Sequence, residues 1–171
     1  LEKISKRVYH IYKYRRRNDE YAAPRKITPS SRKRFIMIKL IVGLKGSGKT
    51  KTLIEKVNAA TETSKGSVIC LEKGDKLRYD IKYQARLINV EEYSLVDAQS
   101  LYGFIAGIHA SNKDITHIFV DGTYRICNKN ITEFEKFVLE CAKLADEADI
   151  NIVMTVSMPV EDIPESVKKY M

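Results

Sequence analysis

The chain has 171 residues and a mass of 19.6 kDa, which fits one domain of ordinary size around a single core. Hydrophobic residues make up 44% and charged residues 30%, so collagen-like and wholly disordered chains are excluded. No apolar run approaches the about 18 to 20 residues of a transmembrane helix, and no secretory signal is present. We therefore expect a cytoplasmic protein without a membrane span.

The cysteines predict neither disulfides nor a zinc site. Their number is odd and none belongs to a CxxC pair, which favours reduced, partly buried thiols. The three histidines stand at no zinc-ligand spacing from them. These residues are Cys70, Cys127, Cys141, His10, His109 and His117.

The net charge of +8 is unevenly distributed. Residues 1–36 hold 12 Lys and Arg against 3 Asp and Glu, a net charge of +9. Residues 37–171 hold 18 basic and 19 acidic side chains, a net charge of −1. The whole excess therefore lies in an N-terminal segment, residues 1–36, which we call the basic arm.

The basic arm has several interpretations. Its Arg runs and interleaved tyrosines are typical of non-specific single-strand nucleic-acid binding. It also fits a flexible, solvated leader, because the chain begins with Leu and Met37 stands just ahead of a strand that would itself begin a complete domain. Binding of an acidic protein or an anionic lipid is the third alternative.

The first predicted strand, residues 37–42, leads directly into a glycine-rich loop. Residues 43–50 read GLKGSGKT and match G-x-x-x-x-G-K-[ST] in full. The glycines allow the backbone N–H groups to surround an anion, Lys49 supplies a charge for the β- and γ-phosphates, and Thr50 supplies a hydroxyl for Mg²⁺. The nucleotide-binding residues predicted here are Gly43, Leu44, Lys45, Gly46, Ser47, Gly48, Lys49, Thr50 and Lys51.

The elements that follow alternate in type, as in βαβ units. We predict a helix over residues 49–63, strands over residues 67–71 and 86–90, and a helix over residues 95–109. A strand over residues 116–121 ends in Asp121, which we assign to the metal. Thr132 and Glu135 resemble a capping box at the start of the next helix, and a strand over residues 150–157 and a short helix over residues 165–170 complete the series.

Near-continuous apolar strands between helices predict an α/β fold. We expect a mostly parallel five-stranded sheet with helices on both faces, formed by residues 37–171. The nucleotide is expected across the carboxyl ends of the first and fourth strands, where open α/β sheets bind their ligands.

GLKGSGKT and the later HIFVD resemble the Walker A and Walker B motifs of P-loop NTPases. The resemblance implies the three-layer P-loop fold with ATP and Mg²⁺ as ligands. GTP is disfavoured because residues 128–130 read NKN and lack the Asp of the base-reading NKxD motif. Leu44 stands where a second branch of the superfamily carries an extra lysine. With these two branches disfavoured, the chain is most similar to the RecA-like group. It also resembles small stand-alone bacterial proteins labelled twitching-motility ATPases.

The RecA-like resemblance also implies roles for residues outside the two motifs. Gly122 follows Asp121 where many such enzymes carry a glutamate, so Glu72, at the end of the second strand, becomes the candidate catalytic base. A polar sensor of the γ-phosphate is implied at Thr155 or Ser157. The candidates for a cationic finger, unless another subunit of a homo-oligomer provides it, are Arg78, Arg86 and Arg125.

Three functions follow from this sequence. The first is a slow ATPase with Lys49 and Glu72 as its catalytic residues. The second is a module that senses ATP without turnover. The third is a small nucleoside-type kinase, with its acceptor region at Tyr79, Asp80 and Tyr83.

Overall fold

The computed structural model describes residues 37–171, and the predicted basic arm lies outside the described residues. Five strands form one sheet in the order β1-β5-β4-β2-β3, and every neighbouring pair is parallel. The strands are β1 (Ile38–Gly43), β2 (Ser67–Glu72), β3 (Ala85–Asn89), β4 (Ile115–Val120) and β5 (Asn151–Ser157). The sheet is therefore all-parallel, where the sequence predicted a mostly parallel one.

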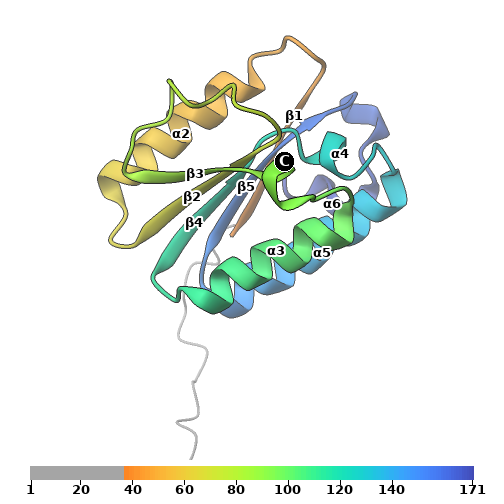
Figure 1. The fold of residues 1–171 in the computed structure, drawn as a ribbon. Helices are drawn as coiled ribbons and strands as arrows, with labels where there is room; N and C mark the ends of the chain where they lie inside the picture. The colour runs from red at the N-terminus through yellow and green to blue at the C-terminus, as the bar shows by residue number, and fades with distance from the viewer. Residues whose placement is uncertain (1–36) are drawn as a thin grey trace, which may run out of the picture. The chain divides into compact units, whose positions relative to one another are not determined.

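The helices lie on both faces of the sheet, which confirms the predicted α/β class. Figure 1 shows α2 over one face and α3 and α5 side by side over the other. The helices are α2 (Lys49–Thr63), α3 (Ala98–Ser111), α4 (Thr123–Ile126), α5 (Ile131–Ala148) and α6 (Glu165–Lys168), and the 3₁₀ turns are η1 (Val90–Tyr93) and η2 (Val160–Asp162).

Most predicted boundaries are confirmed to within a residue, and α2 matches at both ends. The prediction for α3 began too early, at residue 95, because the capping residue is Asp97. The Asp97 carboxylate accepts the N–H of Ser100 at 2.7 Å, and the Ser100 hydroxyl accepts the N–H of Asp97 at 3.2 Å. This reciprocal capping box satisfies amide groups that the first helical turn leaves without partners.

The predicted cap of α5 was wrong. Asn130, not Thr132, is the N-cap, and its side-chain oxygen accepts the N–H groups of Thr132 and Glu133 at 3.1 Å each. The Ser/Thr-x-x-Glu pattern misled because asparagine is an equally good cap and stands two residues earlier.

Two clusters of buried side chains fill the spaces on the two faces of the sheet. The smaller cluster, which includes Leu53 and Val57 of α2 and Phe119 of β4, lies between α2 and the sheet. The larger cluster, which includes Leu101 of α3 and Phe134 of α5, lies on the other face. All three cysteines are buried and free, as the sequence predicted.

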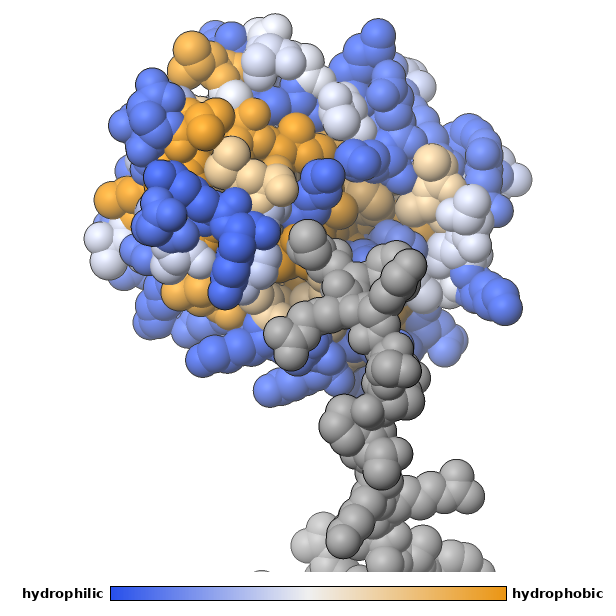
Figure 2. Space-filling model, turned by 180° about the vertical axis from the view of Figure 1, so that it is seen from behind, coloured by the Kyte–Doolittle hydropathy of each residue, from blue (hydrophilic) through white to orange (hydrophobic). Residues whose placement is uncertain are grey.

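The two edge strands of the sheet differ in how they are covered. β1 bonds to β5 on one side, and on the other side the Leu40 N–H donates to the Tyr170 carbonyl at 2.6 Å. Figure 2 shows the molecule of Figure 1 from behind. Hydrophobic surface gathers in the upper part of this view, and hydrophilic surface surrounds it. β3 bonds only to β2, so its outer edge is free within residues 37–171.

The strand order decides which residues meet at the carboxyl edge of the sheet. β5 lies between β1 and β4, so the first and fourth strands are neighbours of β5 and not of each other. Gly43 pairs in register with Ser157, and Val120 pairs with Met154. The loops that follow β1 and β4 therefore approach each other over the end of β5.

No helix within residues 37–171 combines the length and apolar character needed to cross a bilayer.

Candidate functional site

The loop between β1 and α2 makes a tight turn that depends on its glycines. Gly46 and Gly48 have φ values of 86° and 81°, in the left-handed region that other L-residues seldom adopt. A Cβ on Gly43 would lie 2.6 Å from the Ser47 hydroxyl oxygen, so a side chain at position 43 would require the Ser47 side chain to move. The turn brings the backbone back toward the end of β1 and directs the chain into α2.

Lys49 is the buried cation of this loop. Its side chain is only 8% exposed, and its Nζ donates to the Leu44 carbonyl at 2.7 Å and to the Ser47 hydroxyl at 3.3 Å. No side chain caps the amino end of α2, and no acidic residue lies in its first turn. The ammonium group and the first-turn N–H groups together favour binding of an anion.

The other residues of the predicted nucleotide-binding set surround Lys49 at the surface. All of them are exposed except Gly43, which is half-buried. Leu44 is the most notable, with an apolar side chain that is 61% exposed. The exposed residues are Leu44, Lys45, Gly46, Ser47, Gly48, Thr50 and Lys51.

Thr50 and Asp121 lie together, although 71 positions separate them in the sequence. The Thr50 hydroxyl donates to Asp121 Oδ1 at 3.2 Å. The Thr155 hydroxyl on β5 donates to the same Oδ1 at 2.8 Å and accepts the N–H of Gly122 at 2.7 Å. Thr155 is 2% exposed, so it holds the Asp121 carboxylate from below.

This oxygen cluster suits a hard cation that keeps most of its own ligands. Within residues 37–171, no group of three or more His, Cys, Asp or Glu side chains is placed to enclose a metal ion. Mg²⁺ is usually held by one or two protein oxygens together with phosphates and water. Thr50 and Asp121 therefore fit Mg²⁺ as a partner of a bound polyphosphate and do not form a complete metal cage.

Glu72 ends β2 in a buried position. The residue is 2% exposed, and its Oε2 accepts the N–H groups of Lys76 and Leu77 at 3.0 and 3.2 Å. Burial raises the pKa of Glu72 above its ordinary value of 4.5, the two N–H donors lower it, and the charges of Asp121 and Asp75 raise it further. The carboxylate thus organises the loop that follows β2.

The raised pKa of Glu72 predicts a pH effect on stability. The folded state keeps a proton on Glu72 at pH values where the unfolded chain has released it, so this contribution to stability is full below pH 4.5. It is lost as the pH rises through the raised pKa. Because Glu72→Gln removes the titration, the free energy of unfolding of the variant should improve relative to wild type as the pH rises from 4.5 toward neutrality.

Urea unfolding of both proteins across this pH range measures the difference. The control is Glu55→Gln, the same substitution at an exposed position of α2, which should run parallel to wild type. Parallel curves for Glu72→Gln and wild type would contradict the prediction.

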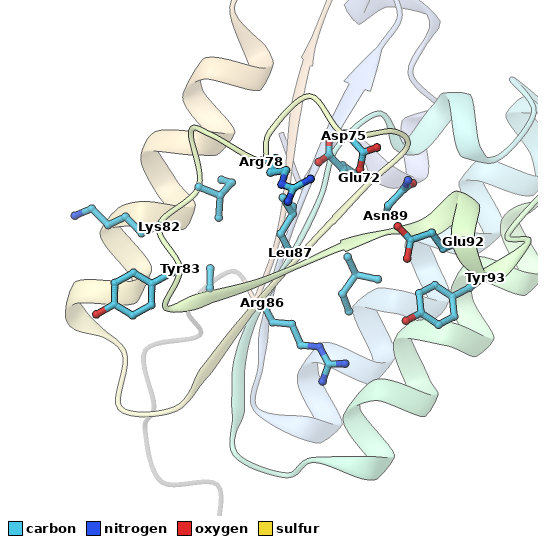
Figure 3. Close-up of a pocket in the computed structure, with 13 residues that line it drawn as sticks. Glu72, Asp75, Arg78, Lys82, Tyr83, Arg86, Leu87, Asn89, Glu92 and Tyr93 are labelled. Atoms are coloured by element: carbon cyan, nitrogen blue, oxygen red, sulfur yellow. The ribbon is translucent and has the colours of Figure 1, made fainter.

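The three candidate arginines do not gather at the glycine loop, and the two sensor candidates have different surroundings. Arg125 is exposed on α4, next to Gly122, and its Nη2 donates to the Lys73 carbonyl at 3.1 Å. Arg78 and Arg86 line a groove beside β3, the strand farthest from β1 (Figure 3). At about 4.8 Å per strand, β3 lies about 19 Å from β1. Ser157 is exposed and pairs in register with Gly43, and of the two sensor candidates it is Thr155 that bonds to Asp121.

Two asparagines that the sequence analysis did not identify hold the loop between β2 and β3. Asn58 of α2 donates to the Asp80 carbonyl at 2.8 Å and accepts the Lys82 N–H at 2.9 Å. Asn89 accepts the Gly74 N–H at 3.1 Å. The pairs are 15 to 24 residues apart in sequence, so no local pattern could have revealed them.

Comparison with known proteins does not assign a family. No protein-family model matches the chain, and the search of curated proteins found no match to it either. Any functional conclusion therefore depends on the residues and geometry described above.

Proposed function

We propose that the chain is a P-loop protein that binds ATP with Mg²⁺ and hydrolyses it slowly. The carrying observation is the 3.2 Å contact between Thr50 and Asp121, beside a glycine turn that contains the buried Lys49. The two halves of the predicted site come from distant parts of the sequence, and the fold brings them into contact. Thr155, one of the two candidate sensor residues, donates to Asp121 at the same site, which also supports the proposal.

Each residue of the site has a definite task in this proposal. The N–H groups of the loop and of the first turn of α2 bind the phosphate oxygens. Lys49 exchanges its contacts with Leu44 and Ser47 for contacts with the β- and γ-phosphates. Mg²⁺, held through Thr50 and Asp121, would neutralise charge on the triphosphate. Thr155 keeps the Asp121 carboxylate oriented toward Thr50.

The environment of Glu72 favours a second candidate, a module that senses ATP without turnover. A general base must reach a water molecule beside the γ-phosphate, whereas the Glu72 carboxylate is buried and accepts two backbone N–H groups. Gly122 after Asp121 provides no alternative base. These features support slow hydrolysis at most, and they fit a nucleotide sensor equally well.

Calorimetric titration of the full chain with ATP, with and without Mg²⁺, tests the proposal. We expect ATP to bind and Mg²⁺ to increase its affinity, and we expect Asp121→Asn to remove most of the Mg²⁺ effect. Asp146→Asn, at an exposed position of α5, is the matched control. Phosphate release above the rate without protein supports the ATPase, binding without release supports the sensor, and absence of ATP binding overturns both.

A further inference from the structure

The segment from Lys73 to Arg86, between β2 and the start of β3, is basic although the described chain as a whole is nearly neutral. It carries five Lys and Arg residues against two Asp residues, whereas residues 37–171 have a net charge of −1. We call this segment, which includes the first two residues of β3, the β2–β3 loop. Its charged and aromatic residues are Lys73, Asp75, Lys76, Arg78, Tyr79, Asp80, Lys82, Tyr83 and Arg86.

The β2–β3 loop is held in place from three sides. Leu77 is 2% exposed and belongs to the core cluster beneath α2. The Glu72 carboxylate accepts the N–H groups of Lys76 and Leu77, and Asn58 of α2 bonds to the backbone at Asp80 and Lys82. Because the backbone is fixed before any ligand arrives, binding would require little further ordering of the loop.

Two tyrosines project from this anchored backbone into solvent. Tyr79 and Tyr83 are each 93% exposed, the largest exposure of any large hydrophobic residue within residues 37–171. Neither ring contacts another aromatic ring among the described residues. The rings are therefore open on both faces, as stacking on a flat partner requires.

One of these rings, Tyr83, lines a groove together with Arg78, Lys82 and Arg86. A cavity of about 410 Å³ follows β3, and Figure 3 shows Arg78 on the loop, Arg86 on β3 and Tyr83 at one end. Lys82 forms an ion pair with Glu62, whereas Arg78 and Arg86 form none within the described chain. Glu72, Asp75 and Glu92 also line the groove, so its lining mixes three acidic with three basic side chains and offers no cluster of cations that would enclose one small anion.

We propose that the β2–β3 loop binds single-stranded nucleic acid, with Tyr79 and Tyr83 stacking on bases and Arg78 and Arg86 contacting phosphates. Spread cations with interleaved, exposed aromatic rings suit a linear chain of phosphates and bases, whereas a small anion would need converging donors. The proposal goes beyond nucleotide binding at Lys49 and does not depend on it.

Fluorescence anisotropy with labelled oligothymidylate, using the full chain without ATP, tests the stacking. We expect the Tyr79→Ala/Tyr83→Ala double variant to bind more weakly by at least about fivefold for each lost stack. Tyr79→Phe/Tyr83→Phe keeps the ring faces and should bind within about twofold of wild type. Photocrosslinking to an iodouracil-containing oligonucleotide should label the peptide that contains Tyr79 and Tyr83.

The salt dependence of binding tests the phosphate contacts and separates the loop from the basic arm, which every variant retains. Arg78→Gln/Arg86→Gln should reduce the slope of log K against log salt by about 1.4, because each phosphate contact to a single strand contributes about 0.7. The control is Lys136→Gln/Lys143→Gln, which removes two exposed charges from α5, on the face of the sheet opposite α2. This control should leave the slope unchanged.

Three results would overturn the proposal. The first is a wild-type chain that does not bind the oligonucleotide. The second is binding whose affinity and salt slope are the same in both loop variants as in wild type, which would assign retention to the basic arm. The third is a loop variant with an altered sedimentation coefficient and unaltered oligonucleotide binding, which would make the loop a protein contact. Thermal unfolding at the wild-type temperature confirms that each variant is folded.

Discussion

Lys49→Ala is expected to lower the affinity for ATP with Mg²⁺ by about 10- to 150-fold, since a hydrogen bond to a charged group contributes about 1.5 to 3 kcal/mol. Lys49 is the only buried lysine within residues 37–171, and its Nζ lies 2.7 Å from a carbonyl of the glycine turn. Alanine leaves the N–H donors of the turn in place but removes the positive charge of Lys49. Calorimetric titration measures the loss directly.

The matched control for this variant lies in the same loop. Lys45→Ala removes an equal charge from an exposed position, four residues before Lys49, and is expected to change the affinity by less than about fivefold because exposed ion pairs contribute about 1 kcal/mol or less. If Lys49→Ala binds ATP as tightly as wild type, the glycine turn is not a phosphate site. If both variants weaken binding equally, general positive charge and not the geometry of Lys49 holds the nucleotide.

Phe119→Ala is expected to lower the free energy of unfolding by about 3 to 5 kcal/mol. Phe119 is 2% exposed on β4, two positions before Asp121, and belongs to the core cluster beneath α2. Removing the ring leaves a cavity between the strand that leads to Asp121 and the helix that carries Thr50. Urea denaturation measures the change, which is a large share of the about 5 to 15 kcal/mol by which domains are stable.

Two further variants make the Phe119 prediction specific. Phe119→Leu retains most of the buried volume and should cost less than about 1.5 kcal/mol, so it remains folded even if the alanine variant does not. Tyr83→Ala removes a ring that is 93% exposed and should alter stability by no more than about 0.5 kcal/mol. A loss for Phe119→Ala as small as that for Tyr83→Ala would show that the ring is not a core residue.

The predictable parts of the fold are those with local or periodic signals. The apolar runs at IKLIV and HIFVD identify β1 and β4, and the helix from Lys49 to Thr63 follows from the loop before it and the spacing of Leu53, Val57 and Ala60. The pairing of Thr50 with Asp121 follows from placing both at the carboxyl edge of one sheet. These inferences require only the strand pattern and one motif.

The remaining features depend on contacts between distant parts of the chain. No pattern in the sequence reveals that Asn58 holds the backbone at Asp80 and Lys82, because these side chain to backbone bonds form only after α2 has packed. The burial of Glu72 was equally hidden, since a glutamate in the run EKGDK is ordinarily solvated. The prediction of the α5 cap failed for a different reason. Asn130 and Thr132 are both acceptable capping residues, they stand two positions apart, and the sequence ranks them almost equally.

The bond between Leu40 of β1 and the carbonyl of Tyr170 has a consequence for how the sheet meets other molecules. Where the C-terminal segment lies against β1, it competes with any foreign strand that would extend the sheet by backbone pairing. At the opposite margin, Arg86 is exposed on β3, and such a charge discourages the same kind of growth. At one edge of the sheet, a segment of the same chain thus occupies the position that a foreign strand would take. At the other edge, a positive charge opposes cross-β pairing with a second copy of the chain.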